Sequence, residues 1–465
     1  VKEVVPTSTN ATSTGPQGLP QTGSPSFQGG DPLVPIDMDS PMTFEDGQPK
    51  KTVQGVGEYT INSDGTITFT PDKQYVGTPA SVTVKRVDKN GTEVTATYTP
   101  TVTRVMPTST NAESTGLQGQ PQSGKPTFSP GDQAVPIDMT KPMTFENGTN
   151  TLVVANQGTY TINSDGSITF TPDKQFTGKA TPVRVKRVDA NGTEITATYT
   201  PEVTKVTPTG TNAESTGIQG QPQKGTPTFT PGDSAVPIDM DSPMTFEDGQ
   251  SKKIVQGVGE YTINSDGSVT FTPEKQYIGT PTPVTVKRVD KNGTEVTATY
   301  TPTVTKVTPI STNATSTGPQ GVPQTGIPTF AGGDTLVPID ETVEPTFEDG
   351  SKKKTIPGQG TYTITPDGAV TFTPDKQFVG KPDPITVKRV DKNGTPVIAT
   401  YSPEYTKVTP TGKDTTSTNI KGHVQTGKPV FEAGDPLVPI DETIAPSFED
   451  GSKEKTVPGE GTYNI

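Results

Sequence analysis

Apolar and polar side chains alternate with a period of two around Tyr59 and again around Phe69. Ile61 ends the first alternating segment, Ile67 begins the second, and the polar run Asn-Ser-Asp-Gly at residues 62–65 separates them. Alternation places every second side chain on one face of a β-strand, and an Asp-Gly run between two such segments is typical of a tight turn. The pattern therefore predicts a strand, a turn and a second strand.

A second hairpin follows, and it is the stronger of the two signals. Its first strand is expected at Val82–Val87, its turn at residues 88–91 (Asp-Lys-Asn-Gly), and its second strand begins with alternate apolar residues from Val94 to Tyr98. β-Branched residues dominate both flanks, and Asn-Gly supplies the positive φ that a tight hairpin loop requires. The extension over residues 99–105 is expected to carry the chain towards the next repeat.

The segment before these hairpins is harder to interpret. Residues 7–30 are rich in Ser, Thr, Gly, Pro and Gln without periodicity, which is compatible with a linker or with an ordered loop. No segment has a helical stripe, so we predict an all-β, immunoglobulin-like sandwich of about six or seven short strands. The alternative is a disordered Pro-rich half fused to a stable double hairpin. Apolar residues spaced by prolines suggest short edge strands at Phe27, Val34, Ile36 and Phe44.

The whole pattern recurs at a fixed interval of 101 residues. A fixed period sets the architecture of a chain before any single residue does, and here it predicts a tandem array of sandwich modules that forms an elongated stalk. Equivalent prolines mark the interval: Pro6, Pro107, Pro208, Pro309 and Pro410. The expected modules are residues 7–107, 108–208, 209–309 and 310–410, with 1–6 as the end of a preceding repeat and 411–465 as a truncated fifth.

Composition and charge narrow the class of protein. Only 27% of the 465 residues are apolar, Trp is absent, and Gly and Pro number 49 each, so each module should have a thin core. The formal charge of −13 is spread along the repeats without a basic face, which argues against nucleic acid as a partner. No apolar stretch reaches the roughly 18 residues of a membrane span.

The run GEYTINSDGTITFTPDKQYVGTPASVTVKRVDKNGTEVTATYTPTV, residues 57–102, resembles the CshA-type fibril repeat of streptococcal surface adhesins. The resemblance recurs from Gly158, Gly259 and Gly360 in the same frame, so it covers essentially the whole chain. In that family, as the resemblance implies, repeats form the stalk of a wall-anchored fibril, and a separate non-repetitive N-terminal region binds the host. It implies an extracellular, cell-surface chain that is anchored to the cell wall through parts of the parent protein not present in this sequence.

The function expected from these observations is structural rather than enzymatic. The repeats would project an adhesive N-terminal region away from the wall, in support of host attachment, biofilm formation and virulence, with neighbouring repeats as their partners. The alternative is that the repeats themselves bind weakly and multivalently to host matrix proteins or to repeats on other cells. We expect no catalytic, cofactor-binding or metal-binding residues, because nucleophile–base and metal-ligand constellations are missing.

Two motifs look like recognition or metal chemistry. Residues 19–23 read Leu-Pro-Gln-Thr-Gly, which matches a sortase signal, but the apolar span and basic tail of a working signal do not follow. We therefore interpret the motif as a loop whose sequence varies between copies and matches the signal by chance. Asp37 and Asp39, like the turns at 62–65 and 88–91, resemble fragments of calcium loops. They lack the closing bidentate Glu, so ordinary turn chemistry is expected.

Three further features have an ordinary structural explanation. Lys85 and Asn90 suggest an isopeptide cross-link, but both are expected on one hairpin near an exposed tip, so we interpret them as parts of a solvated turn. His423 is the single histidine, in a variable position, and serves neither catalysis nor metal. Gly55 and Gly57 precede a strand rather than a helix, so they do not form a phosphate-binding loop.

Overall fold

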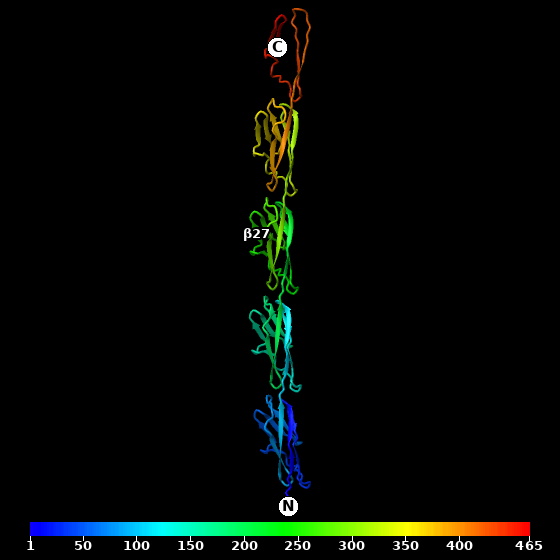
Figure 1. Ribbon diagram of the computed structural model, residues 1–465, viewed down its shortest axis with the longest axis vertical. Helices are drawn as coiled ribbons and strands as arrows, with labels where there is room; N and C mark the ends of the chain where they lie inside the picture. Colours follow the sequence, from blue (N-terminus) through cyan, green and yellow to red (C-terminus); the bar gives the residue numbers. More distant parts are fainter. The chain divides into compact units, whose positions relative to one another are not determined.

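The computed structural model describes all 465 residues, and every helix or strand element in it is a strand (Figure 1). The prediction of an all-β chain built from repeated sandwich units is confirmed. Residues 7–107 supply ten strands rather than the six or seven predicted, because segments of only two or three residues also pair. These strands are β1 (Thr7–Thr9), β2 (Ala11–Pro16), β3 (Gln21–Gly23), β4 (Ser26–Gln28), β5 (Thr43–Phe44), β6 (Lys50–Val53), β7 (Gly57–Ile61), β8 (Ile67–Pro71), β9 (Val82–Val87) and β10 (Glu93–Thr103).

The ten strands form two four-stranded sheets and one short pair. One sheet has the order β2-β10-β9-β5, the other has the order β3-β8-β7-β6, and β1 pairs with β4. Both predicted hairpins are present: β7 pairs with β8 and β9 with β10, each antiparallel. Each hairpin supplies the centre of one sheet, so the two strongest signals in the sequence define the two layers of the sandwich.

The segment expected to be a linker or an ordered loop forms β1 to β4. β2 lies parallel to β10, with Ala11 opposite Tyr98 and Pro16 opposite Thr103. The sequence conceals this strand because its residues are small and polar, and smallness has a steric reason: a Cβ at Gly15 would lie 3.2 Å from the Cβ of Gln21. The alternative of a disordered Pro-rich half is therefore wrong.

The four predicted edge-strand residues divide into two pairs. Phe27 lies in β4 and Phe44 in β5, as expected for short edge strands. Val34 and Ile36 form only isolated bridges, to Asp31 and Asp88. Pro32 and Pro35 beside these residues limit the ladder to single bridges, because proline has no N–H to donate.

The core of residues 7–107 lies between the two sheets. Tyr59 and Phe69 stack with their ring centroids 4.5 Å apart, and Tyr98 from the other sheet meets Tyr59 edge-on at 6.2 Å. All three rings are fully buried. The buried cluster holds only eleven residues, in agreement with the thin core expected from composition. A few aromatic contacts, each worth about 0.5–1.5 kcal/mol beyond its buried area, therefore carry much of the packing.

The later repeats have strands at matching positions. Residues 108–208 contain β11 (Thr108–Thr110), β12 (Ala112–Leu117), β13 (Gln122–Gly124), β14 (Thr127–Ser129), β15 (Thr144–Phe145), β16 (Thr151–Val154), β17 (Gly158–Ile162), β18 (Ile168–Pro172), β19 (Gly178–Lys179), β20 (Val183–Val188) and β21 (Glu194–Thr204). Residues 209–309 contain β22 (Thr209–Thr211), β23 (Ala213–Ile218), β24 (Gln223–Gly225), β25 (Thr228–Thr230), β26 (Thr245–Phe246), β27 (Lys252–Val255), β28 (Gly259–Ile263), β29 (Val269–Pro273), β30 (Val284–Val289) and β31 (Glu295–Thr305).

The remaining strands complete the chain. Residues 310–410 contain β32 (Ile310–Thr312), β33 (Ala314–Pro319), β34 (Gln324–Gly326), β35 (Thr329–Ala331), β36 (Thr346–Phe347), β37 (Lys353–Ile356), β38 (Gly360–Ile364), β39 (Val370–Pro374), β40 (Ile385–Val390) and β41 (Pro396–Thr406). Residues 411–465 contain β42 (Thr411–Lys413), β43 (Val430–Glu432), β44 (Glu454–Val457) and β45 (Gly461–Asn464). By its contacts the chain divides into two compact units, residues 1–209, 229–242 and 288–296 in one, and residues 210–228, 243–287 and 297–465 in the other.

Candidate functional site: the joint between repeats

In each whole repeat, the turn between the two strands of the β9–β10-type hairpin has the sequence Asp-x-Asn-Gly. We call this turn the tip (residues 88–91, 189–192, 290–293 and 391–394). In the second repeat, Oδ1 of Asp189 accepts hydrogen bonds from the backbone N–H groups of Asn191, at 2.9 Å, and Thr193, at 2.8 Å. Asp88 makes the same two bonds in the first repeat. The tip is thus an aspartate-stabilised turn whose shape is set within its own hairpin.

The asparagine of the tip reaches a different repeat. Nδ2 of Asn191 donates a 2.8 Å hydrogen bond to the backbone carbonyl of Gln17, which lies 174 residues earlier in the chain. The side chain is only 7% exposed. Our prediction of a solvated tip is therefore wrong for the later copies, because a neighbouring repeat covers them; Asn90, which has no whole repeat before it in this sequence, is exposed. Equivalent bonds join Asn292 to Gln118 at 2.8 Å and Asn393 to Gln219 at 2.9 Å.

The glutamine that receives the tip uses all four of its polar groups. The backbone N–H of Gln118 donates to Thr204 O, and its carbonyl accepts from Asn292. Its side-chain Nε2 donates to Lys174 O at 2.9 Å, and its Oε1 accepts from the backbone N–H of Val206 at 3.1 Å. Gln118 is 3% exposed, so each lost partner would leave a buried polar group unsatisfied.

A glycine follows this glutamine for steric reasons. Gly119 has φ +74°, and a Cβ built on it would lie 2.0 Å from Oδ1 of Asn292. Gly18 repeats this relationship to Asn191, with φ +78° and 1.9 Å. Both the backbone conformation and the close approach of the tip therefore require glycine.

A Lys-Gln corner forms the second wall of the site. Nε2 of Gln74 donates to the backbone carbonyl of Asn191 at 2.5 Å, and Nζ of Lys73 donates to Ala190 O at 3.1 Å. Gln175 makes the equivalent bond to Asn292 at 2.6 Å. The Gln-Gly turn and the Lys-Gln corner together are called the socket (residues 17–18 with 73–74, and copies 118–119 with 174–175, 219–220 with 275–276, and 320–321 with 376–377).

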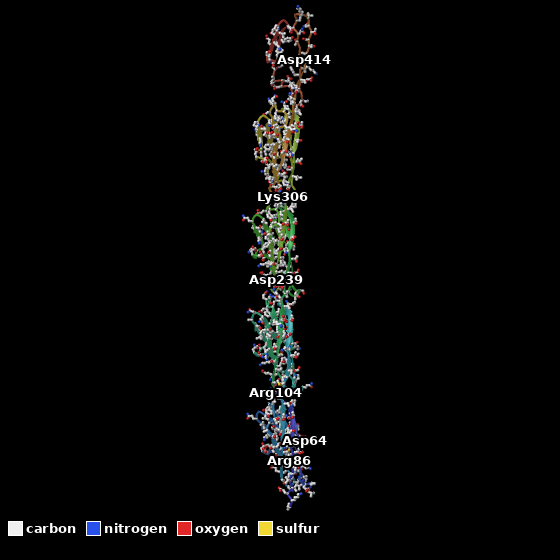
Figure 2. All side chains as sticks on the ribbon, viewed as in Figure 1. Asp64, Arg86, Arg104, Asp239, Lys306 and Asp414 are labelled. Carbon is white, nitrogen blue, oxygen red and sulfur yellow. The ribbon has the colours of Figure 1, made fainter.

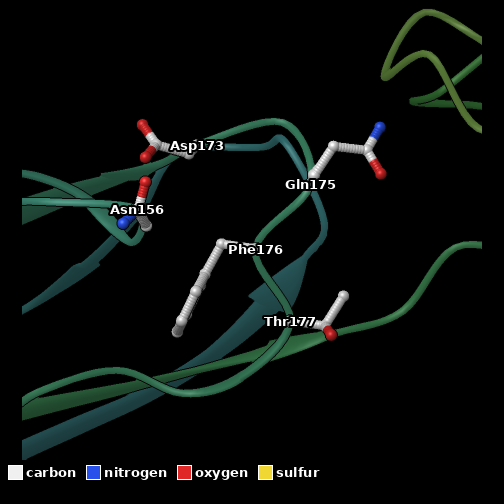
Figure 3. Close-up of a pocket in the computed structure, with 5 residues that line it drawn as sticks. All are labelled: Asn156, Asp173, Gln175, Phe176 and Thr177. Atoms are coloured by element: carbon white, nitrogen blue, oxygen red, sulfur yellow. The ribbon is translucent and has the colours of Figure 1, made fainter.

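An open hollow of about 390 Å³ lies beside the socket of the second repeat. Asn156, Asp173, Gln175, Phe176 and Thr177 line it, and Gln175 points away from Asn156 and Phe176 (Figure 3). Asn156 has φ +63° where the first repeat has Gly55, at +72°. The polar groups of this lining are one carboxylate, two side-chain amides and one hydroxyl.

The linker between repeats is held on both sides. Val105 is 4% exposed, and its N–H donates to Oε1 of Gln17 in the repeat that it leaves. The next residue, Met106, presses its backbone against the following repeat, because a Cβ at Gly131 would lie 2.3 Å from Met106 O. Arg104 and the equivalent Lys306 begin these linkers and are exposed (Figure 2). Four residues separate β10 from β11, which leaves the joint little slack.

The sortase-like sequence and the lysine of the suggested isopeptide bond lie outside the joint, and their hydrogen bonds and ion pairs are within one repeat. The sortase-like sequence continues into β3, where Gly23 packs so closely that a Cβ would lie 2.1 Å from the Tyr98 ring. Leu19 and Pro20 lie in the loop that we expected, whereas Gln21–Gly23 form a strand at the edge of the sheet. The isopeptide alternative finds no support, since Lys85 lies 3.5 Å from Glu93 and the equivalent Lys186 lies 3.4 Å from Glu194.

The acidic residues at 37 and 39 surround a lysine. Nζ of Lys89 bonds to Asp37, and it lies 2.8 Å from Asp39. Hydrogen bonds from Lys89 and then Ser40 lower the pKa of Asp37 to about 2. No group of three or more His, Cys, Asp or Glu side chains is arranged to hold a metal ion, and His423 is exposed. Gly55 lies in the turn between β6 and β7, and Gly57 is the first residue of β7.

The sequence reasoning missed the socket. Its signal was present, because Gln-Gly recurs at 17–18, 118–119, 219–220 and 320–321. The Lys-Gln corner also recurs in every whole repeat. Gln118 and Gln175 contact the tip of another repeat as well as their own module, and a comparison of single modules does not reveal that contact.

Comparison with known families places this architecture in a class. The sequence matches the family described as "Surface adhesin CshA repetitive domain" over residues 3–102, 104–203, 205–304, 306–405 and 407–465. The chain therefore belongs to this family of surface adhesin repeats, and the resemblance inferred from the sequence is confirmed. Membership implies a cell-surface location and, with the all-β fold, points to a structural role. No curated protein matches the sequence.

Several solved structures match the chain at low sequence identity. The protocadherin GammaB4 extracellular domain matches at a TM-score of 0.33 and 11% identity, covering 91% of this chain and 72% of its own. Sidekick-1 immunoglobulin domains 1–5 match at 0.23 and 12%, covering 86% and 81%. Drosophila N-cadherin EC1-4 matches at 0.21 and 11%, covering 86% and 99%. No helix of this chain has the length and apolarity that crossing a membrane requires.

Proposed function

We propose that this chain is a stalk segment of a bacterial surface fibril, and that its joints keep successive repeats aligned so that an adhesive N-terminal region is projected from the wall. The observation that carries the proposal is the filled socket: tips at Asn191, Asn292 and Asn393 are each buried against the preceding repeat. Neighbour-to-neighbour contacts of this kind make an array behave as one long body.

The proposal includes the module boundaries, wall anchoring and the absence of enzymatic activity. Modules are taken as residues 7–107, 108–208, 209–309 and 310–410, with 411–465 as part of a fifth, and anchoring as a property of other parts of the parent protein. Host attachment and biofilm formation would then depend on the region that the stalk carries. Membership of a surface adhesin family supports this assignment.

Small-angle X-ray scattering on the whole chain tests the stalk. A compact globule of this length has a radius of gyration of about 23 Å and an unfolded chain about 80 Å. An aligned array should give roughly 45–60 Å, from strands that rise about 3.3 Å per residue. A matched variant with Asn191, Asn292 and Asn393 changed to Ala should lose the longest distances. A radius near 23 Å would contradict the proposal.

One observation favours a second function, weak multivalent binding by the repeats themselves. The first three repeats share an exposed methionine at one equivalent position, Met38, Met139 and Met240, at 70% or 71% exposure. A repeated apolar side chain can raise avidity through effective concentration without a strong single site. Binding of host matrix protein that rises steeply from one repeat to four, and falls on Met→Glu substitution, would establish this function instead.

A further inference from the structure

The first and last long strands of each whole repeat are parallel neighbours. β2 pairs with β10 over six residues, and the equivalent parallel pairs are β12 with β21, β23 with β31 and β33 with β41. The chain reaches β2 soon after the N-terminal side of the repeat and leaves directly from the C-terminal end of β10. Tension between the two ends therefore pulls the two strands in opposite directions along their axes.

Such loading is shear. When two strands slide past each other, all the inter-strand hydrogen bonds must stretch together, whereas strands pulled apart from one end lose their bonds one at a time. The hydrogen bonds of a parallel pair are evenly spaced and slanted, so each takes a similar share of the load. The three-residue β1–β4 pair precedes this point and would separate first.

Side chains tie the parallel pair together at both ends. At the N-terminal end, the Tyr98 hydroxyl lies 2.6 Å from Oγ of Ser13, which donates to Gln21 at 2.6 Å. Gln21 in turn donates to the backbone carbonyl of Thr101 at 3.1 Å. At the C-terminal end, Oγ1 of Thr103 donates to Gly15 O, also at 3.1 Å. The Tyr98 ring is fully buried, which limits access of water to these bonds.

We propose that this parallel pair is a tension-bearing clamp, and that the chain resists pulling between its ends as well as holding a fixed length. This goes beyond the stalk, because a stalk can project without carrying load. The sheet β3-β8-β7-β6 lies outside the direct path between the ends of the chain and would be loaded only after the clamp yields. The clamp thus responds to a mechanical force, which is applied by any surfaces to which the two ends of the chain are attached.

Single-molecule force spectroscopy on the whole chain, pulled from its termini, tests the clamp. The test variant replaces the clamp serines by alanine (Ser13, Ser114, Ser215 and Ser316), and a second replaces the partner tyrosines by Phe (Tyr98, Tyr199, Tyr300 and Tyr401). The matched control removes two side-chain hydrogen bonds per repeat from the β7–β8-type turn, by Asn→Ala at Asn62, Asn163 and Asn264.

The clamp predicts that unfolding at a given force accelerates about tenfold in the serine or tyrosine variant. The turn variant should unfold under force at the wild-type rate, even if its thermal stability falls by the same amount as that of the clamp variants. Equal acceleration in clamp and turn variants, or stepwise low-force opening of the wild type, would overturn the proposal. This test is independent of the scattering test of the stalk, because repeats connected by flexible joints also align under tension. The clamp can therefore be confirmed or rejected whether or not the free chain is aligned.

Discussion

The tips of the first and second repeats have nearly the same sequence and the same turn, but different surroundings. Asp88 and Asp189 cap their turns with the same pair of backbone hydrogen bonds. Asn90 is exposed, whereas Asn191 is 7% exposed and bonded to Gln17. The conformation of the turn is therefore set within its own hairpin, and the neighbouring repeat determines whether the asparagine side chain is buried and bonded.

The sockets show the same contrast at the other side of the joint. Gln118 is 3% exposed with the Asn292 tip in place, whereas Gln320 is only partly buried although it keeps its own side-chain bonds. Docking adds little new structure to either partner. A joint between two preformed surfaces loses little conformational entropy on closing, which is why a few hydrogen bonds of about 1 kcal/mol each are sufficient.

The largest effect is expected for Gly119→Ala. The new Cβ would overlap Oδ1 of Asn292, and φ +74° adds roughly 1–2 kcal/mol of backbone strain. Loss of the tip contact leaves buried polar groups unpaired, at about 1–3 kcal/mol. Calorimetry of the whole chain should show one repeat melting well below the others.

The control for that substitution is Gly321→Ala. Gly321 has φ +83° but no tip against it, and the nearest atom to a Cβ is Lys376 O at 3.8 Å. It should therefore cost only the backbone strain. Equal losses at both glycines would mean that the Asn292 contact contributes nothing.

Gln118→Ala should have the next largest effect. It removes the partners of Lys174 O and the Val206 N–H, both at the joint, for about 2–3 kcal/mol in total. Hydrogen exchange at Val206 should accelerate accordingly. Gln320→Ala removes the same two kinds of bond at a less buried site, so the amide of Val408 should accelerate less. Equal acceleration would show that burial by the tip is irrelevant.

Much of the fold could be predicted from the sequence, but little of the joint. Alternating apolar residues around Tyr59 and Tyr98 identify the two central hairpins. β2 was not recognised because its residues are small and polar and give no alternation, and at Gly15 the close approach of the Gln21 side chain requires a small residue. Asn191 was misjudged because its burial comes from a segment 174 residues away. A pattern read within one module reports that module's core and omits surfaces which exist only between copies.

Asn191→Ala tests the tip itself, with a smaller expected effect of about 1–2 kcal/mol, because one buried carbonyl loses its donor. Asn90→Ala is the matched control, and a surface change of that kind should stay within about 0.5 kcal/mol. Limited proteolysis at the linker after Thr103 should be faster in the first variant alone. Cleavage that is equally fast in both variants would contradict the joint.

The smallest expected effect is on pH dependence, in which the first two tips differ because only the first carries a lysine. Lys89 of the first tip holds the pKa of Asp37 at about 2, whereas the second tip has Ala190 at the matching position, and the lowered pKa of Asp138 comes from the hydroxyl and N–H of Thr140. Because the folded pKa of Asp37 lies below the unfolded value of about 3.9, its stabilising contribution is complete above about pH 4. It is lost as the pH falls through 2. Lys89→Ala should raise the titration midpoint of Asp37, followed by NMR of its carboxyl carbon, and leave that of Asp138 unchanged. An unaltered Asp37 midpoint would show that Lys89 does not hold the loop at residues 37–40 to the tip.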